Sequence, residues 1–171
     1  MNKKVLILVI AIVAAVAVLG VSFWLTDGFG LLRLNSSPSA STGEATITVA
    51  SKTAEAGKNV RVPVTFTGNP GAMGFLLEFH YDPETLEYIN VEKGDFLTDC
   101  EASEKNGVIK VIDVEDNDVK KDGVLFQLNF KVKDSAKGST KVELVPQEND
   151  VCNYKEESVS YQAVSGTITI Q

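Results

Sequence analysis

Apolar and polar residues alternate with a period of two along most of the chain after residue 45. In the run at 59–68, Val60, Val62 and Val64 fall on one side and the residues between them fall on the other. Such alternation is typical of strands with one face in a core, and Asn, Asp, Gly and Pro mark turns between the runs. We therefore expect an all-β sandwich of about nine strands. The expected strands lie at 45–51, 59–68, 72–82, 86–96, 107–116, 123–133, 140–146, 158–164 and 166–171.

The outer faces of several expected strands mix apolar with polar residues. In the run at 72–82 the large aromatic side chains face inward, which leaves Leu76 outward beside Glu78. If Lys110 faces outward, the same alternation turns Ile112 and Val114 outward. An apolar centre with a polar rim is typical of a protein interface. The alternatives are a bulge that turns Ile112 and Val114 inward, or isolated surface apolar residues. In the run at 123–133, the expected outward residues are Leu125, Gln127, Asn129 and Lys131.

The N-terminus carries an uncharged apolar run from Val5 to Leu25, preceded by Lys3 and Lys4. A membrane-spanning helix needs about 20 apolar residues, whereas the apolar region of a signal peptide has roughly 7–15. Trp24 suits a membrane interface, and the lysines favour a cytoplasmic start. We expect a single-pass anchor with the rest of the chain on the extracellular face of the cell membrane. Cleavage of the segment, which would release the protein, is the alternative.

The chain divides into a membrane segment at 1–33, a Ser-rich linker at 34–45 and one β domain at 46–171. The composition of the linker is typical of a flexible spacer. The chain has 16 basic and 23 acidic residues, and the first 33 residues hold more basic than acidic ones. The β domain is therefore acidic, which argues against a nucleic-acid partner because nucleic-acid binding depends on phosphate neutralisation.

Few residues of the domain suit catalysis or metal binding. His80 is the only histidine, and no nucleophile or phosphate-loop motif accompanies it. Cys100 and Cys152 lie in a domain expected outside the cytoplasm, where either a disulfide or two free thiols can occur. The acidic stretch at 113–118 departs from a calcium loop, because Asp118 stands where such a loop needs Gly. We expect a solvated strand end there, no metal, no cofactor and no enzyme activity.

Carbohydrate binding is the main alternative among binding functions. Sugar-binding sandwiches present exposed planar aromatic side chains, yet the only tryptophan, Trp24, lies in the N-terminal segment. Tyr88, Tyr154 and Tyr161 are the remaining candidates for stacking on a sugar, and they are scattered along the chain. A tethered carbohydrate-binding module therefore stays open as an alternative, and a structural spacer is a third possibility.

Three segments together resemble cohesin modules: "SKTAEAGKNVRVPVTFTG", "GFLLEFHYDPETLEYINVEKGDFL" and "DGVLFQLNFKVKDSAKG". Their order and spacing match the family pattern across about 46–171. The resemblance implies a nine-stranded jelly-roll sandwich that binds a dockerin, which is itself a calcium-binding pair of helices. It also implies a place in cellulosome-type assemblies for polysaccharide degradation, with the dockerin carried by a secreted glycoside hydrolase or a scaffold subunit. Calcium is then expected on the partner and not on this chain.

The resemblance implies a binding plateau on one sheet, made by the third, fifth, sixth and eighth strands. Well-studied cohesins carry Asn and Asp on the third strand where this chain has Gly74 and Leu76, which implies a more apolar partner. The membrane segment implies a surface-anchored protein with a single cohesin. The residues mapped to the plateau are Gly74, Leu76, Glu78 and His80 on the third strand, Lys110, Ile112, Val114, Glu115 and Asp116 on the fifth, and Gln127 and Asn129 on the sixth.

Overall fold

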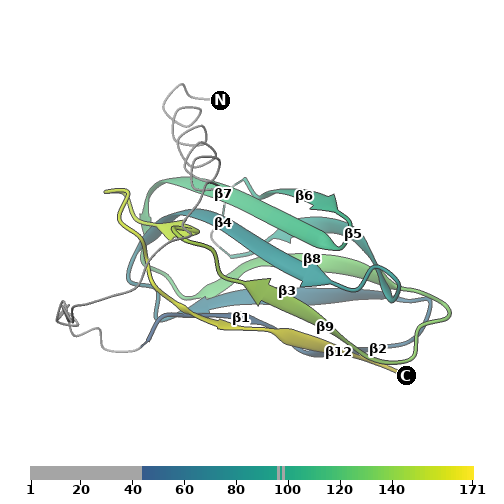
Figure 1. Ribbon diagram of the computed structural model, residues 1–171. Helices are drawn as coiled ribbons and strands as arrows, with labels where there is room; N and C mark the ends of the chain where they lie inside the picture. The colour runs from purple at the N-terminus through teal and green to yellow at the C-terminus, as the bar shows by residue number, and fades with distance from the viewer. Residues whose placement is uncertain (1–43, 96, 98) are drawn as a thin grey trace, which may run out of the picture. The chain divides into compact units, whose positions relative to one another are not determined.

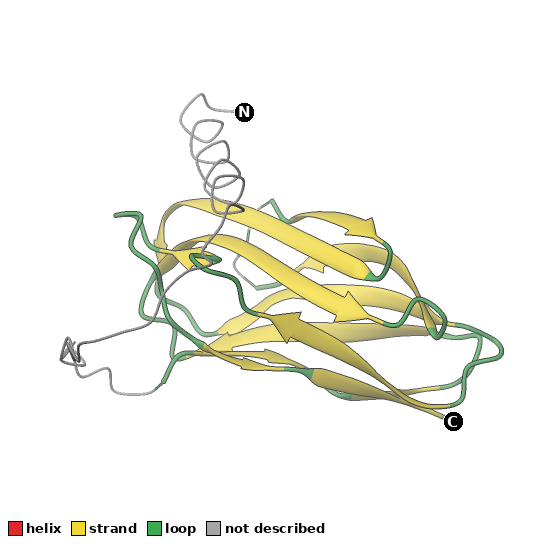
Figure 2. Ribbon diagram, in the orientation of Figure 1, coloured by secondary structure: helices red, strands yellow, loops and turns green. Residues whose placement is uncertain are grey.

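The computed structural model describes residues 44–95, 97 and 99–171. Within these ranges the chain forms β-strands and loops without any helix (Figures 1 and 2). The described part accordingly contains no apolar helix of membrane-spanning length. The anchor expected at Val5–Leu25 lies outside the described residues, as does most of the expected linker. The predicted all-β sandwich is confirmed.

The first sheet has five strands in the order β11-β1-β3-β8-β5. Its long strands are antiparallel neighbours, and β11 adds to β1 in a parallel pair. Each long strand turns its apolar residues toward the second sheet, because side chains alternate between the two faces. The bounds are β1 (Thr46–Val49), β3 (Asn59–Thr67), β5 (Leu86–Lys93), β8 (Gly123–Val132) and β11 (Gln162–Val164).

The second sheet follows the order β2-β12-β9-β4-β7-β6, and β10 pairs with the beginning of β4. Its longest pairing joins β4 to β7 in antiparallel register. The bounds are β2 (Lys52–Ala54), β4 (Ala72–Tyr81), β6 (Glu101–Lys105), β7 (Val108–Val119), β9 (Gly138–Val145), β10 (Val151–Cys152) and β12 (Gly166–Ile170).

Aromatic side chains from both sheets meet in the core between them. Phe66 of β3 packs edge-to-face on Phe75 of β4, with ring centroids 6.2 Å apart. Phe79 of β4 packs in the same way on Phe126 of β8 at 5.8 Å. All four rings are buried. Edge-to-face pairs of this kind add to the stabilisation from apolar burial and fix how the sheets stack.

The structure differs from the prediction in one omitted strand, β6, and in the direction of Leu125 on β8. The prediction omitted β6, because every residue of Glu101–Lys105 is exposed and the segment shows no apolar alternation. Leu125, expected outward, is fully buried. A register shift in the β3–β8 pairing pairs Val64 with Phe126 and the next residue, Thr65, with Val124, so that Leu125 is an extra residue between them. Such a bulge turns a side chain to the opposite face.

Asp113 is an acidic residue on the inner side of β7. It is 2% exposed, and its Oδ1 accepts a hydrogen bond from the backbone N–H of Asp99 at 3.0 Å. Burial, together with the nearby carboxylates of Glu115 and Asp99, raises the pKa of Asp113 to about 6, although the Asp99 N–H opposes this shift. The expectation of a solvated acidic strand end is therefore wrong for Asp113, while Asp116 and Asp118 are exposed.

Because the pKa of Asp113 is higher in the folded state than in the unfolded chain, ionisation of Asp113 lowers stability as pH rises through about 6. We expect Asp113→Asn to match the wild type near pH 4 and to exceed its free energy of unfolding by about 1–3 kcal/mol near pH 8. Urea unfolding of both proteins across this pH range measures the difference. A difference that stays constant with pH would show that Asp113 does not titrate in this way.

Candidate functional site

The pairing of β4 with β7 brings together most of the residues that the resemblance maps to the plateau. Gly74 lies opposite Val114, and Leu76 lies opposite Ile112. The next outward pair, two residues further along β4, is Glu78 with Lys110. The residues between them on β4 are buried in the core, so these pairs face away from it. We call this surface the β4–β7 face, and its residues are Gly74, Leu76, Glu78, His80, Lys110, Ile112 and Val114.

The apolar side chains of the β4–β7 face are half-buried and lie on the outer side of the sheet. Leu76 and Ile112 each lie between two buried neighbours, and Val114 follows the buried Asp113. The alternative in which a bulge turns Ile112 and Val114 into the core is therefore wrong. Val145 of β9, half-buried as well, lies opposite Glu78 and widens the apolar strip.

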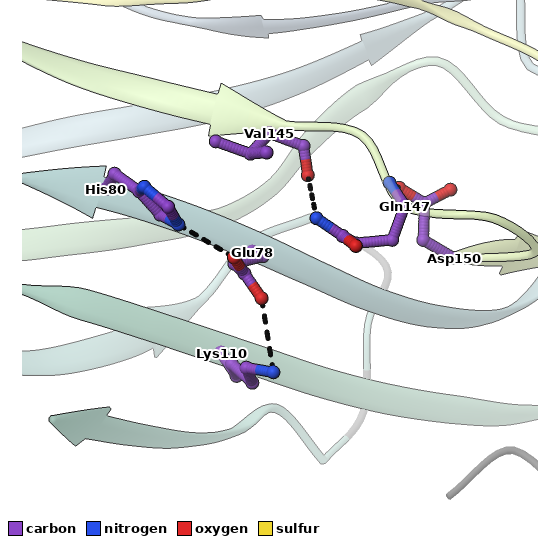
Figure 3. A network of polar contacts seen from close by, with 6 residues as sticks. All are labelled: Glu78, His80, Lys110, Val145, Gln147 and Asp150. Atoms are coloured by element: carbon purple, nitrogen blue, oxygen red, sulfur yellow. Dashed lines mark hydrogen bonds and ion pairs between the residues drawn. The ribbon is translucent and has the colours of Figure 1, made fainter. Parts of the chain in front are cut away.

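Glu78 forms an ion pair with Lys110 and a hydrogen bond with His80 in the middle of the face (Figure 3). Its Oε1 lies 2.7 Å from His80 Nε2, and its Oε2 lies 3.1 Å from Lys110 Nζ. The Glu78 side chain is 17% exposed. Burial opposes its ionisation, but the hydrogen bonds to His80 and Lys110 outweigh burial and lower the pKa of the Glu78 carboxyl. Glu78 is thus a charged but partnered residue, and His80 is held by it.

The charges around the apolar strip differ between its two ends. At the His80 end, Lys105 of β6 lies opposite Val108, while Glu143 of β9 lies opposite His80 and pairs with Lys141 at 2.7 Å. At the other end, Glu101 of β6 lies opposite Ile112, and the exposed Asp116 follows on β7. The prediction missed the β6 residues, because no apolar pattern marked their strand.

Gln127 and Asn129 do not join the β4–β7 face. Both lie on β8, which belongs to the other sheet, and Asn129 is buried with its Nδ2 donating to Asn90 Oδ1 at 2.7 Å. Their assignment to the plateau sheet is wrong, because the unrecognised β6 shifted the strand count by one. Glu115 lies on the same side of β7 as Asp113 and interacts with it, so it faces away from Val114.

At Gly74, the last residue of the β4–β7 face, the sheet is covered by the thiol of Cys152. Cys152 lies opposite Gly74, and a Cβ at position 74 would stand 2.8 Å from Cys152 Sγ. The thiol therefore occupies the space of a side chain at this position. Cys100 and Cys152 are both free thiols, and burial raises the pKa of Cys100 to about 12. Among the described residues, no three His, Cys, Asp or Glu residues are placed to hold a metal ion.

Of the three tyrosines considered for sugar stacking, two are partly buried. Tyr88 packs edge-to-face on Phe130 at 6.0 Å and is partly buried. Tyr161 donates a hydrogen bond to Asp150 Oδ2 at 2.5 Å and is also partly buried. Tyr154 alone is exposed, in the loop after β10.

Comparisons with known proteins agree with this architecture. The cohesin domain family model matches residues 45–170. Cellulose-binding protein A of Clostridium cellulovorans is 30% identical over 142 residues, which cover 78% of this chain and 8% of that much longer protein.

Solved cohesin structures share the fold. A cohesin–dockerin complex of OlpA from Clostridium thermocellum aligns with a TM-score of 0.69 at 17% identity, covering 75% of this chain and 100% of the other. A non-cellulosomal cohesin from the archaeon Archaeoglobus fulgidus aligns with a TM-score of 0.67 at 25% identity, covering 75% and 92%. The family model spans nearly all of the described residues, and the chain belongs to the cohesin family.

Proposed function

We propose that this chain captures a dockerin-bearing protein through the β4–β7 face. Cohesin domains are binding modules, and several solved structures that share this fold are cohesins in complex with dockerins. The observation that carries the proposal is the outward apolar strip of Leu76, Ile112 and Val114 in matched cross-strand positions. Such a strip loses contact with water when a folded partner covers it, which supplies most of the binding free energy.

The chemistry of the face favours a partner with an apolar contact surface. Gly74 offers no side chain, and the thiol of Cys152 takes the adjacent space. The polar Asn and Asp contacts that the resemblance associates with the third strand are therefore replaced by Leu76 and, at the buried Gly74, by the thiol of Cys152. A partner that needs hydrogen bonds at these two positions would leave its polar groups unpaired, which costs more than the lost contact alone.

The charges bordering the strip give the partner an orientation. The end near Asp116 and Glu101 attracts basic groups, while Lys105 and Lys110 lie toward the other end. Charges at the rim of an interface mainly affect the association rate and the register of docking. Glu78 is satisfied by His80 and Lys110, so covering it leaves no unpaired charge in the interface.

We further propose that the N-terminal segment tethers this single module to the extracellular face of the cell membrane, in a cellulosome-type system for polysaccharide degradation. The length and position of the apolar run at Val5–Leu25 support this proposal. The protein then acts as a non-catalytic receptor. His80, the sole histidine, is engaged by Glu78 and does not contact a nucleophile in the described residues.

Introducing a carboxylate into the apolar strip tests the face. We expect Leu76→Asp and Ile112→Asp each to weaken dockerin binding by about 2 kcal/mol or more, because a charge would be desolvated against an apolar surface. Isothermal titration calorimetry with dockerins from the source organism gives the affinities, and circular dichroism checks that the fold is retained. Ile89→Asp is the matched control, since Ile89 is 45% exposed on the other sheet.

Unchanged affinity in both face variants would contradict the proposed face. If only Ile89→Asp loses binding, the dockerin binds to the other sheet and not to the β4–β7 face.

Removal of calcium tests which of the two proteins, the dockerin or this chain, needs calcium for its fold. We expect a chelator to abolish capture of the dockerin-bearing protein, because the calcium-dependent fold belongs to the partner. The thermal unfolding midpoint of this protein by itself should not change with chelator, since its described residues hold no metal-binding cluster. A pull-down and a thermal melt, each with and without chelator, measure the two effects. If chelator lowers the thermal unfolding midpoint of this protein by itself, this chain binds a structural cation and the prediction is wrong.

A further inference from the structure

Tyr154 is the most exposed large apolar side chain of the described residues, at 64%. It lies in the loop between β10 and β11, which Figure 1 shows in yellow-green, projecting from one end of the sandwich. An exposed tyrosine on a mobile loop would need no explanation. The loop that carries Tyr154 is, however, extensively hydrogen-bonded.

Asn153 closes the loop around Tyr154. Its side-chain Oδ1 accepts hydrogen bonds from the backbone N–H groups of Lys155 and Glu157, at 2.9 and 3.0 Å. Its Nδ2 donates to Glu157 Oε2 at 2.8 Å, and its backbone N–H donates to the Glu157 carbonyl at 3.0 Å. Glu156 adopts a left-handed conformation with φ of 64° and donates its N–H to the Asn153 carbonyl. Such a turn fixes the backbone of the loop, so the Tyr154 ring keeps only the freedom of its own side-chain rotamers.

The loop is also attached to the β4–β7 face. The backbone N–H of Tyr154 donates to Asp118 Oδ1 at 2.6 Å, at the end of β7. Two residues earlier, Cys152 pairs with Gly74. The Asp150 carbonyl accepts the N–H of Leu76 at 2.7 Å. Tyr154 is therefore positioned beside the end of the face where Gly74 and Val114 lie.

We propose that Tyr154 extends the β4–β7 face and is its aromatic anchor, inserting into an apolar pocket of the dockerin. This inference rests on the proposed function. Tyrosine is enriched among interface hot spots because its large, rigid side chain loses little conformational entropy on binding. Here the loop has already fixed the backbone of Tyr154 before the partner arrives.

The surroundings of Tyr154 define the chemistry of the partner. Burial and the nearby carboxylates of Glu156 and Asp118 raise the pKa of the Cys152 thiol, and Asp118 also accepts the Tyr154 N–H. Asp116 is exposed on the same strand end. The pocket that receives Tyr154 therefore has an apolar floor and basic side chains at its rim.

Truncation of the ring is the direct test. In titrations with the dockerin captured by the wild type, we expect Tyr154→Ala to weaken binding about 30-fold, which corresponds to 2 kcal/mol at 1.4 kcal/mol per factor of ten. Tyr154→Phe keeps the ring and should stay within about threefold of the wild type. Ile89→Ala on the other sheet is the matched truncation and should have no effect, since Ile89 is exposed but distant in the fold.

Asp118 is a positioning residue in this proposal, and two variants isolate that role. Asp118→Ala and Asp118→Asn both remove the charge, but only Asn keeps an oxygen that can accept the Tyr154 N–H. We expect the Ala variant to bind more weakly than the Asn variant. Equal affinities for the two would show that the hydrogen bond does not position Tyr154.

Three results would overturn the inference, and they differ in what they leave standing. If Leu76→Asp abolishes binding while Tyr154→Ala leaves it unchanged, the proposed function stands and the anchor role is wrong. If the wild type binds no dockerin, the proposed function and the inference fail together. If Tyr154→Ala reduces retention on microcrystalline cellulose or xylan while dockerin affinity stays the same, the ring stacks on sugar instead.

Discussion

The antiparallel register between β4 and β7 determines which side chains form the binding face. It pairs Leu76 with Ile112, Gly74 with Val114 and Glu78 with Lys110 on one outer face. Because side chains alternate along a strand, a slip of one residue would move all of them to the opposite side. The inner side chains prevent this slip: Phe75 and Phe79 are locked by edge-to-face contacts with rings of the other sheet. The binding face is thus held in place by the core beneath it.

This arrangement explains how the outer face of a sheet can offer selectivity. The centre is apolar, the acidic Glu78 within it is held by Lys110 and His80, and further charged residues such as Glu101, Asp116 and Lys105 are placed toward the ends. Gly74 and the thiol of Cys152 remove polar groups from a position where related modules are expected to carry them. A partner is then selected by matching apolar shape and by the cost of leaving its own polar groups unpaired. The Tyr154 loop, fixed to the same two strands, adds an exposed aromatic side chain beside this face.

The sequence was sufficient for the fold class and for the two central strands of the face, because Leu77, Phe79, Ile109 and Val111 impose a clear period of two. It was insufficient for β6, where all five side chains meet solvent and no alternation is needed. That omission shifted the strand count and placed Gln127 and Asn129 in the wrong sheet. The bulge that buries Leu125 and the burial of Asp113 also left no local signal, since both arise from pairing between distant segments. The sequence identified Tyr154 as a candidate for stacking on a sugar, but it did not predict the hydrogen bonds that fix the loop around it.

The most direct test of the central claim is to map the partner onto the backbone of this protein. Isotope-labelled protein titrated with its dockerin, and followed by NMR amide shifts, reports which strands are covered. We expect the shifts to cluster on β4, β6, β7 and β9 and on the loop around Tyr154, and we expect β3, β5 and β8 to stay unchanged. Shifts concentrated on β3, β5 and β8 would contradict this expectation.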